Sequence, residues 1–320
     1  MFDIKAHMTA GSVDAAIDLL ARHPGARLIA GGTDVLLRLR QGDDRYASLV
    51  DIHGLADLRF IDTDGDQNIR IGSGTVFADL LHSDIICRRV PALAEAAGSV
   101  GGPQIRNVAT LGGNLCNGSP GADSAPALFA LNARLEIKGK QGVRQVPIAD
   151  FYQGPFRVDL GPSEILTAVI LPRQDYQGYA GHYYKYAVRK AMDIATIGCA
   201  VNLRAPSGRM EDFRIAYGAA GPVPLRCPAA EQAAAGRPVT GRLLTDIADA
   251  VLQDVAPRTS WRASGEFRRH LAAELAIRVT RTALDRAGQA GHGTDGLRTP
   301  AVPAAGRPPG RKPGPERSES

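Results

Sequence analysis

Two glycine pairs, each after an apolar run, constrain this 320-residue chain more than any other feature. Gly31-Gly32 lies in LIAGGTDVL, and Gly112-Gly113 lies in ATLGGNLCNG. Glycine lets the backbone bend where other residues cannot, and it lets a ligand approach the N–H groups without a Cβ in between. Successive N–H groups pointing into one concavity bind anions. One such pair also fits an ordinary tight turn. Two pairs, flanked by Thr33, Thr110 and Asn114, predict two loops that close on a dinucleotide pyrophosphate from either side.

Other nucleotide-binding and hydrolase motifs are missing from the sequence. There is no G-x-x-x-x-G-K-[ST], which argues against a P-loop. Gly72-Ser73-Gly74 begins like a Rossmann fingerprint, but Phe77 stands in place of the third glycine, so we interpret the segment as the end of a strand. No serine occupies a G-x-S-x-G motif, since proline follows the serine in GSPG at 118–121. The sequence therefore does not indicate a hydrolase.

Cysteines and histidines are dispersed along the chain. Cys87, Cys116, Cys199 and Cys227 form no C-x-x-C, and the seven histidines include no pair one helical turn apart. Clustered thiolates of the kind that hold iron–sulfur centres are thus missing from the sequence. We predict no metal site and four small, buried, reduced thiols.

Composition is that of an ordinary globular protein, with 44% hydrophobic residues and a net charge of +5. Basic residues are scattered among acids and form no basic face interleaved with aromatics, which argues against nucleic-acid binding. No apolar stretch approaches the roughly 20 residues of a membrane helix. The N-terminus lacks the apolar core of a signal peptide. We therefore expect a cytoplasmic protein with no membrane association.

Hydrophobic patterning predicts an α+β chain of two domains and a tail. Residues 1–175 alternate short apolar strands with helices, including a helix over 11–23 capped by Ser12. Residues 180–287 contain three segments typical of an antiparallel sheet, followed by two long amphipathic helices. Residues 288–320 are rich in Gly, Pro, Ser and charge, and we expect them to be disordered.

Four segments resemble the FAD-binding subunits of molybdenum hydroxylases. LIAGGTDVL (28–36) and VGGPQIRNVATLGGNLCNGSPGADSAPALFAL (100–131) are similar to the two flavin-binding signatures of that family. YKYAVRKAMDIATIGCAV (184–201) and VLQDVAPRTSWRASGEFRRHLA (251–272) are similar to its C-terminal domain. The closer similarity is to the FAD-binding subunit of three-subunit bacterial xanthine dehydrogenases, from Met1 to about Ala287.

The resemblance implies a two-lobed FAD-binding domain of the vanillyl-alcohol-oxidase or PCMH type, followed by a smaller α+β flavoprotein domain with an antiparallel sheet. FAD would lie between the lobes, without a covalent link, since neither Ala30 nor Leu111 could anchor it. The residues implied to contact FAD are Leu28, Ile29, Ala30, Gly31, Gly32, Thr33, Asp34, Val35, Thr110, Leu111, Gly112, Gly113, Asn114, Asp123, Leu166 and Lys185.

Three of these residues also have structural explanations. Leu166 fits a core position, Asp123 could cap the helix that follows, and Lys185 could be a solvated strand residue. Some relatives carry an inserted, cysteine-containing segment for an additional iron–sulfur cluster. Here the chain runs from Asn114 to Asp123 without room for it, so Cys116 is a lone thiol.

The resemblance further implies an electron-transfer subunit that does not touch the substrate. A molybdopterin subunit would hydroxylate a purine, [2Fe-2S] clusters on another partner would carry the electrons, and FAD here would pass a hydride to NAD+. The cofactor carries the redox chemistry, so no catalytic residue is nominated. Alternatives are the flavin subunit of another molybdenum hydroxylase, acting on carbon monoxide, nicotinate or an aldehyde, a nucleotide-binding scaffold without redox activity, and a self-contained flavin oxidase.

Overall fold

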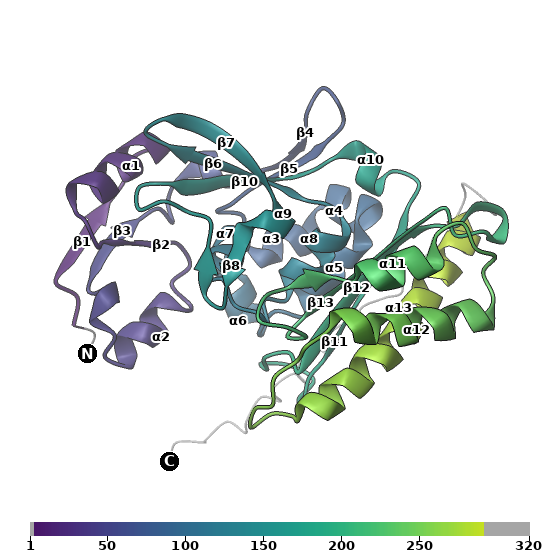
Figure 1. Cartoon of the computed structure of the whole chain (residues 1–320). Helices are drawn as coiled ribbons and strands as arrows, with labels where there is room; N and C mark the ends of the chain where they lie inside the picture. The colour runs from purple at the N-terminus through teal and green to yellow at the C-terminus, as the bar shows by residue number, and fades with distance from the viewer. Residues whose placement is uncertain (1–2, 291–320) are drawn as a thin grey trace, which may run out of the picture.

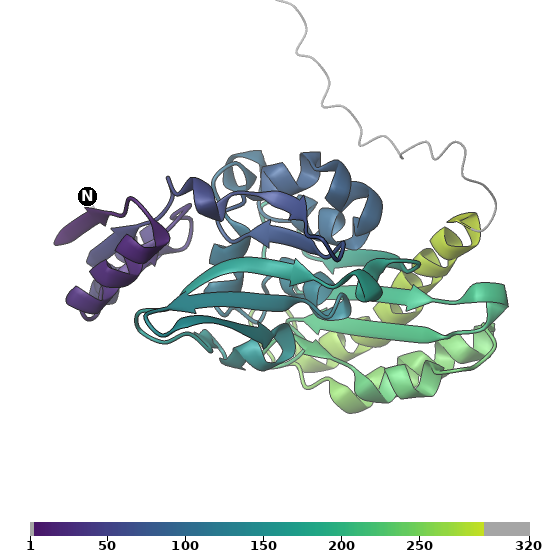
Figure 2. The ribbon, with the colours of Figure 1, turned by 90° about the horizontal axis from the view of Figure 1, so that it is seen from above.

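The computed structural model describes residues 3–290 of the chain. Figure 1 shows a small N-terminal lobe at one end, a sheet with helices in the middle, and a second sheet with three helices at the other end. The view from above in Figure 2 gives the same order of the three parts. The structure confirms the predicted mixture of helices and sheets.

The N-terminal lobe contains a three-stranded parallel sheet in the order β1-β3-β2. Helix α1 packs its buried residues, among them Ala16 and Ile17, into the core of this lobe. The Ser12 hydroxyl accepts a hydrogen bond from the Ala15 N–H at 3.1 Å, which confirms the predicted N-cap. The elements of the lobe are β1 (Ala6–Thr9), α1 (Val13–Arg22), β2 (Arg27–Ile29), α2 (Val35–Arg40), η1 (Asp44–Tyr46), β3 (Ser48–Asp51) and η2 (Ala56–Leu58).

The middle part is a five-stranded antiparallel sheet in the order β4-β5-β10-β6-β7, with helices packed on it. A two-stranded hairpin, β8 with β9, lies beside it. The strands are β4 (Ile61–Thr63), β5 (Ile69–Gly72), β6 (Arg134–Gly139), β7 (Gly142–Pro147), β8 (Tyr152–Gly154), β9 (Arg157–Val158) and β10 (Ile165–Leu171). The helices are α3 (Phe77–His82), α4 (Asp84–Arg89), α5 (Pro91–Gly98), α6 (Pro103–Arg106), α7 (Leu111–Cys116), α8 (Ser124–Ala130) and α9 (Ile148–Phe151).

The C-terminal part is a four-stranded antiparallel sheet, β11-β12-β13-β14, with three helices against one face. The three predicted strands and the two long helices are confirmed here. Helix α13 continues beyond Ala287, and the remainder of the predicted tail, 291–320, lies outside the described residues. The elements are α10 (Arg173–Tyr176), β11 (Ala180–Tyr186), β12 (Ile197–Arg204), η3 (Pro206–Gly208), β13 (Asp212–Gly218), β14 (Leu225–Arg226), α11 (Pro228–Ala234), α12 (Gly241–Asp254) and α13 (Gly265–Ala290).

The C-terminal sheet is buried on both faces. One face packs against α13 and its neighbours, while Ala200 of β12 and Ala216 of β13 belong to the core of the middle part. Helix α8 contacts β12 and β13, and α5 contacts β11. The middle and C-terminal parts are therefore joined by a shared apolar core. Division of the chain into domains at 175 and 180 stays a prediction.

The second glycine pair differs from its predicted role as a turn after a strand. Gly112 and Gly113 lie in the first turn of α7. Thr110 caps this helix, because its hydroxyl accepts a hydrogen bond from the Gly113 N–H at 3.0 Å. The cap starts helical backbone where the sequence suggests only a tight turn.

Glu95 on α5 links β11 and α13 to the middle part through hydrogen bonds and ion pairs. Its carboxylate accepts a hydrogen bond from the Tyr183 N–H at 2.8 Å, lies 2.8 Å from His182 Nδ1, and pairs with Arg286. Burial raises the pKa of Glu95, but the bonds from His182 and Arg286 outweigh it, so the pKa lies below its ordinary value of 4.5. This stabilisation is therefore present above pH 4.5 and is lost as the pH falls through the folded-state pKa.

We predict that Glu95→Gln lowers the free energy of unfolding at neutral pH by about 1–3 kcal/mol, because charged hydrogen bonds are lost. The variant should also lose less stability than the wild type on acidification. Urea unfolding across a pH series measures both effects. Glu274→Gln, which breaks an exposed pair with Arg278, is the matched control and should cost at most about 0.5 kcal/mol. Parallel pH profiles for Glu95→Gln and wild type would contradict the prediction.

Candidate functional site

The first glycine pair forms a loop with unused backbone donors between β2 and α2. Within residues 3–290, the N–H groups of Gly31, Gly32, Thr33 and Asp34 donate to no protein acceptor. Gly32 has a φ of +71°, a left-handed conformation that favours glycine. Consecutive free N–H groups in such a turn suit an anion. This loop therefore has the donors expected of a phosphate-binding site.

The second glycine pair has no such free donors. The four N–H groups from Leu111 to Asn114 are all bonded, at 2.8–3.0 Å, to the carbonyls of Ser73, Thr75 and Thr110 and to the Thr110 hydroxyl. The structure thus differs from the expectation of two backbone cradles. Binding of a ligand by this segment would have to use its side chains and the bare surface of its glycines.

The two glycine segments nevertheless meet in space. A Cβ on Gly31 would lie 1.9 Å from the carbonyl oxygen of Val108 and 3.0 Å from Cα of Ala109. No side chain can occupy that position, so only glycine permits this approach of backbone to backbone. Gly112 is equally constrained, since its Cβ would lie 2.6 Å from Cβ of Ser73. Figure 1 shows β2 and α2 facing α6 and α7 across this junction.

Asp123 and Lys185 are paired beside the glycine loops. The Lys185 ammonium lies 2.8 Å from the Asp123 carboxylate, and these side chains are only 9% and 10% exposed. Lys185 also donates to the carbonyls of Ser99 at 3.0 Å and Asp193 at 2.7 Å. All three protons of the Lys185 ammonium therefore have protein acceptors, whereas the resemblance implies that Lys185 donates a hydrogen bond to FAD. Lys185 instead ties the end of α5, the start of α8 and the loop 187–194 together.

The environment of Asp123 explains this pairing. Burial raises the pKa of its carboxyl group, and Lys185 opposes that rise together with the Tyr183 hydroxyl, which donates to Asp123 at 3.2 Å. Asp123 precedes α8 without making the cap bond that the structural explanation proposed. A buried carboxylate without these partners would be costly.

The remaining predicted residues fall into two groups. Asn114 is joined to the start of α8, because its Oδ1 accepts a hydrogen bond from the Ser124 hydroxyl at 2.6 Å. It thereby links α7 to the segment that holds Asp123. Leu166 lies in β10 beneath α7, is 3% exposed, and belongs to the core of the middle part. The structure thus connects the second glycine segment, through Asn114 and Ser124, to the pair of Asp123 and Lys185. Leu166, in contrast, has almost no exposed surface for a ligand.

Three exposed apolar side chains around these loops were not predicted from the sequence. Phe156, Met192 and Ile194 are each more than half exposed. The Phe156 N–H donates to the Gly118 carbonyl, and the Met192 sulfur lies 2.7 Å from the position of a Cβ on Gly102. Exposed apolar side chains beside glycine loops offer a surface on which a flat ring system can pack. These three residues stand in polar segments, where composition alone predicts ordinary loops.

The thiols do not add a metal centre to this region. Within residues 3–290, no group of three or more His, Cys, Asp or Glu side chains could hold a metal ion. Burial raises the pKa of the Cys116 and Cys199 thiols to about 12, so both stay protonated at neutral pH. Cys87 is exposed and Cys116 is half-buried as a residue, which corrects the prediction that all four thiols are buried. No helix among the described residues is long and apolar enough to cross a membrane.

Comparison with known proteins identifies the class to which this fold and site belong. Residues 2–174 match the model of the FAD binding domain in molybdopterin dehydrogenase, and residues 182–283 match that of the CO dehydrogenase flavoprotein C-terminal domain. The fold is thus that of a two-part flavoprotein. The chain belongs to the FAD-binding subunits of molybdenum hydroxylases and is the medium subunit of such a multi-subunit enzyme.

Individual relatives agree with this assignment. The xanthine dehydrogenase FAD-binding subunit of Escherichia coli O157:H7 is 49% identical over 288 residues, covering 90% of this chain and 99% of the relative. The glyceraldehyde dehydrogenase medium chain of Sulfolobus acidocaldarius is 31% identical, covering 85% and 96%. The structure of carbon monoxide dehydrogenase from Hydrogenophaga pseudoflava matches with a TM-score of 0.85 and 31% identity, covering 89% of this chain and 99% of the other.

We predict that Gly31→Ala lowers FAD affinity roughly tenfold or more, because the new Cβ forces the two loops apart. Flavin content after purification and a fluorescence titration with FAD measure the effect. Gly54→Ala is the matched control, since a Cβ there meets open space. Circular dichroism separates loss of affinity from unfolding. Unchanged flavin content in folded Gly31→Ala would contradict the assignment of this junction.

We also predict strong coupling between Asp123 and Lys185. Lys185→Met leaves a buried carboxylate without its cation and should lower the free energy of unfolding by about 3–5 kcal/mol. The double variant with Asp123→Asn should be more stable than Lys185→Met alone. Urea unfolding of the two single variants, the double variant and the wild type completes the cycle. Additive losses would show that the pair is not coupled.

Proposed function

We propose that this chain holds FAD non-covalently between its N-terminal lobe and its middle part and serves as the flavin subunit of a xanthine dehydrogenase. It would receive electrons from [2Fe-2S] clusters of one partner subunit, while a second partner carries molybdopterin and hydroxylates the purine. Reduced FAD would pass a hydride to NAD+. The observation that carries the proposal is the row of free N–H groups from Gly31 to Asp34, held against Val108 and Ala109, in a family of FAD-binding subunits.

The residues around the junction fit FAD. The free N–H groups of Gly31 to Asp34 and the Thr33 hydroxyl would hold the pyrophosphate and ribityl oxygens. Phe156, Met192 and Ile194 would pack against the isoalloxazine ring. When bound, FAD supplies the exchange between one-electron and hydride transfer. The protein supplies position and electrostatics.

No side chain in this site is required to move a proton. The Lys185 ammonium is bound to three protein oxygens, and the Cys116 thiol stays protonated. Lys185 acts through Asp193, because its bond to that carbonyl fixes the loop 187–194 that carries Met192 and Ile194. The chain therefore orients the cofactor and leaves the redox chemistry to it.

The percentage of sequence identity to the relatives favours xanthine over other substrates. The flavin subunit of xanthine dehydrogenase is 49% identical, whereas the glyceraldehyde dehydrogenase relative is 31% identical. A flavin subunit for carbon monoxide, nicotinate or an aldehyde would use the same junction, since its residues face the cofactor and not the hydroxylated substrate. The assembled complex, assayed with hypoxanthine, carbon monoxide, nicotinate and glyceraldehyde, distinguishes these alternatives.

The first experiment is a visible spectrum of the purified full-length chain. We expect a flavin spectrum, release of FAD by acid without protease treatment, and bleaching on anaerobic addition of NADH. A colourless chain that takes up no added FAD would favour the scaffold alternative. A yellow chain whose flavin NADH does not reduce would overturn NAD+ as the acceptor while leaving FAD binding intact. Turnover without any partner would favour the self-contained oxidase.

A further inference from the structure

Arg38 makes a contact between the N-terminal lobe and the middle part that the proposed function does not use. It lies on α2, and its partner Phe156 lies in the turn between β8 and β9. The Arg38 guanidinium stands over the Phe156 ring, 5.6 Å from the ring centre, which is within the range of a cation–π interaction. Figure 1 shows that α2 belongs to the lobe at one end and β8 to the middle part. The contact therefore joins the two parts.

The backbone holds Phe156 in a conformation that few residues adopt. Its φ is +59°, in the left-handed region that disfavours a bulky side chain. Its N–H donates to the Gly118 carbonyl at 2.9 Å, and Gly118 itself has a φ of +64°. A Cβ on Gly118 would lie 3.0 Å from Cα of Phe156, which is tighter than an ordinary contact. The turn therefore fixes the direction in which the Phe156 side chain leaves the backbone, at the cost of local strain.

The Arg38 side chain has no other close partner. It is half-buried, and within residues 3–290 its guanidinium forms no ion pair and no hydrogen bond. Its charge acts on the carboxylates of Asp34 and Asp43 only at longer range. Phe156 is still 56% exposed beside Arg38. Arg38 therefore restricts the ring on one side and leaves the rest of the ring surface free for a ligand.

The contact stands at the far end of both glycine segments. Arg38 follows Asp34 by one helical turn, and Asp34 is the last of the four residues with free N–H groups. Gly118, which holds the Phe156 backbone, follows the end of α7, the helix that contains the second glycine pair. The segment with the free donors is thus held against the middle part at two places, at Gly31 by the backbone contact and at Arg38 by the Phe156 ring.

We propose that Arg38 is a positioning residue for FAD and acts through Phe156. The inference rests on the proposed function, in which Phe156 packs against the isoalloxazine ring. Arg38 holds the Phe156 ring in place through the cation–π contact and keeps α2 against the β8–β9 turn. Loss of this contact frees the ring and loosens the connection between the two parts that enclose the cofactor. FAD then leaves the site faster, because it lies between these two parts.

The rate of FAD release from the full-length chain tests this role. The chain is loaded with FAD and diluted, and the rise of flavin fluorescence follows the release. Arg38→Gln should release FAD about fivefold faster or more, because it removes the cation from the ring. Arg38→Lys should release FAD at a rate between the two, since lysine restores the charge but not the planar stacking. The visible circular dichroism of the bound flavin should change in the same order, because it reports the surroundings of the isoalloxazine ring.

A double-variant cycle separates action through Phe156 from a direct action of Arg38 on FAD. Phe156→Leu should release FAD roughly fivefold faster or more, because the aromatic ring is lost. Arg38→Gln added to Phe156→Leu should then change the rate by less than about twofold, since the ring on which Arg38 acts is already missing. An effect of Arg38→Gln that is as large in the Phe156→Leu background as in the wild type would overturn its action through Phe156.

Two matched variants control for the loss of a charge and of a ring. Arg22→Gln removes an exposed arginine from the same lobe, and Phe267→Leu removes an exposed ring from α13, so both should release FAD at the wild-type rate. Urea unfolding shows whether Arg38→Gln is folded. A wild-type release rate in folded Arg38→Gln would overturn the positioning role while FAD binding stands. A wild-type chain that takes up no FAD would overturn the proposed function, and the positioning role with it.

Discussion

The contact of Gly31 with the backbone of Val108 and Ala109 sets the arrangement of the site. At 1.9 Å from a carbonyl oxygen, the place of its Cβ is already filled, so the approach depends on the missing side chain. This contact places a loop with four free N–H groups against the segment that leads into α7. Without it, the N-terminal lobe would present the same donors to open solvent, and they would have no opposite wall.

Three kinds of interaction contribute to the structure of the site. The first glycine loop supplies donors, whereas the second is internally bonded and supplies a surface without side chains. The buried pair of Asp123 and Lys185 orders the segments behind both loops, and its cost in desolvation is offset by hydrogen bonds to Ser99, Asp193 and Tyr183. This arrangement is what a cofactor-driven reaction requires, since the protein must position a group and need not exchange protons with it.

Local sequence patterns were sufficient for the elements and for the first glycine loop. Interactions within a few residues determine the Ser12 cap, the antiparallel strands and the long helices. The Gly31-Gly32 pair predicts a loop whose backbone N–H groups are accessible to a ligand. The state of the second loop could not be predicted, because its N–H groups are bonded to Ser73 and Thr75 of a distant segment. The role of Lys185 was missed for the same reason, since its three acceptors come from three separate segments.

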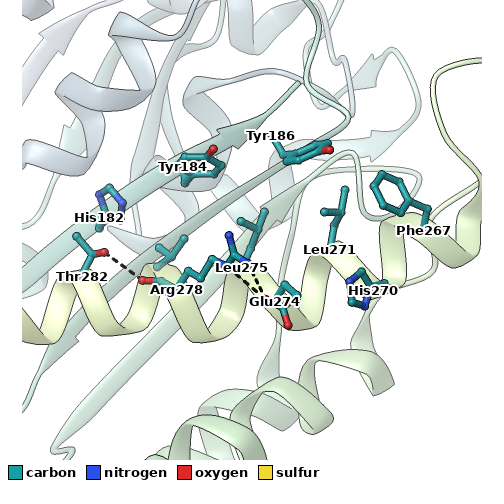
Figure 3. A pocket seen from close by; sticks show the side chains of 11 residues that line it. His182, Tyr184, Tyr186, Phe267, His270, Leu271, Glu274, Leu275, Arg278 and Thr282 are labelled. Atoms are coloured by element: carbon teal, nitrogen blue, oxygen red, sulfur yellow. Dashed lines mark hydrogen bonds and ion pairs between the residues drawn. The ribbon is translucent and has the colours of Figure 1, made fainter. Parts of the chain in front are cut away.

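Strand β11 has one further consequence that follows from its alternation. Tyr183 and Lys185 reach Asp123 on one face, while Tyr184 and Tyr186 line a groove between β11 and α13 on the other (Figure 3). A slip of one residue in its pairing with β12 would exchange the two faces, moving a cation into an aromatic groove and tyrosines into the buried ionic network. The observed register, with Lys185 opposite Gly198, is thus a single setting shared by both surfaces. A mutation that shifts this register would disrupt both faces of β11 at once. Substitutions that affect one face through the register are therefore constrained by the other face as well.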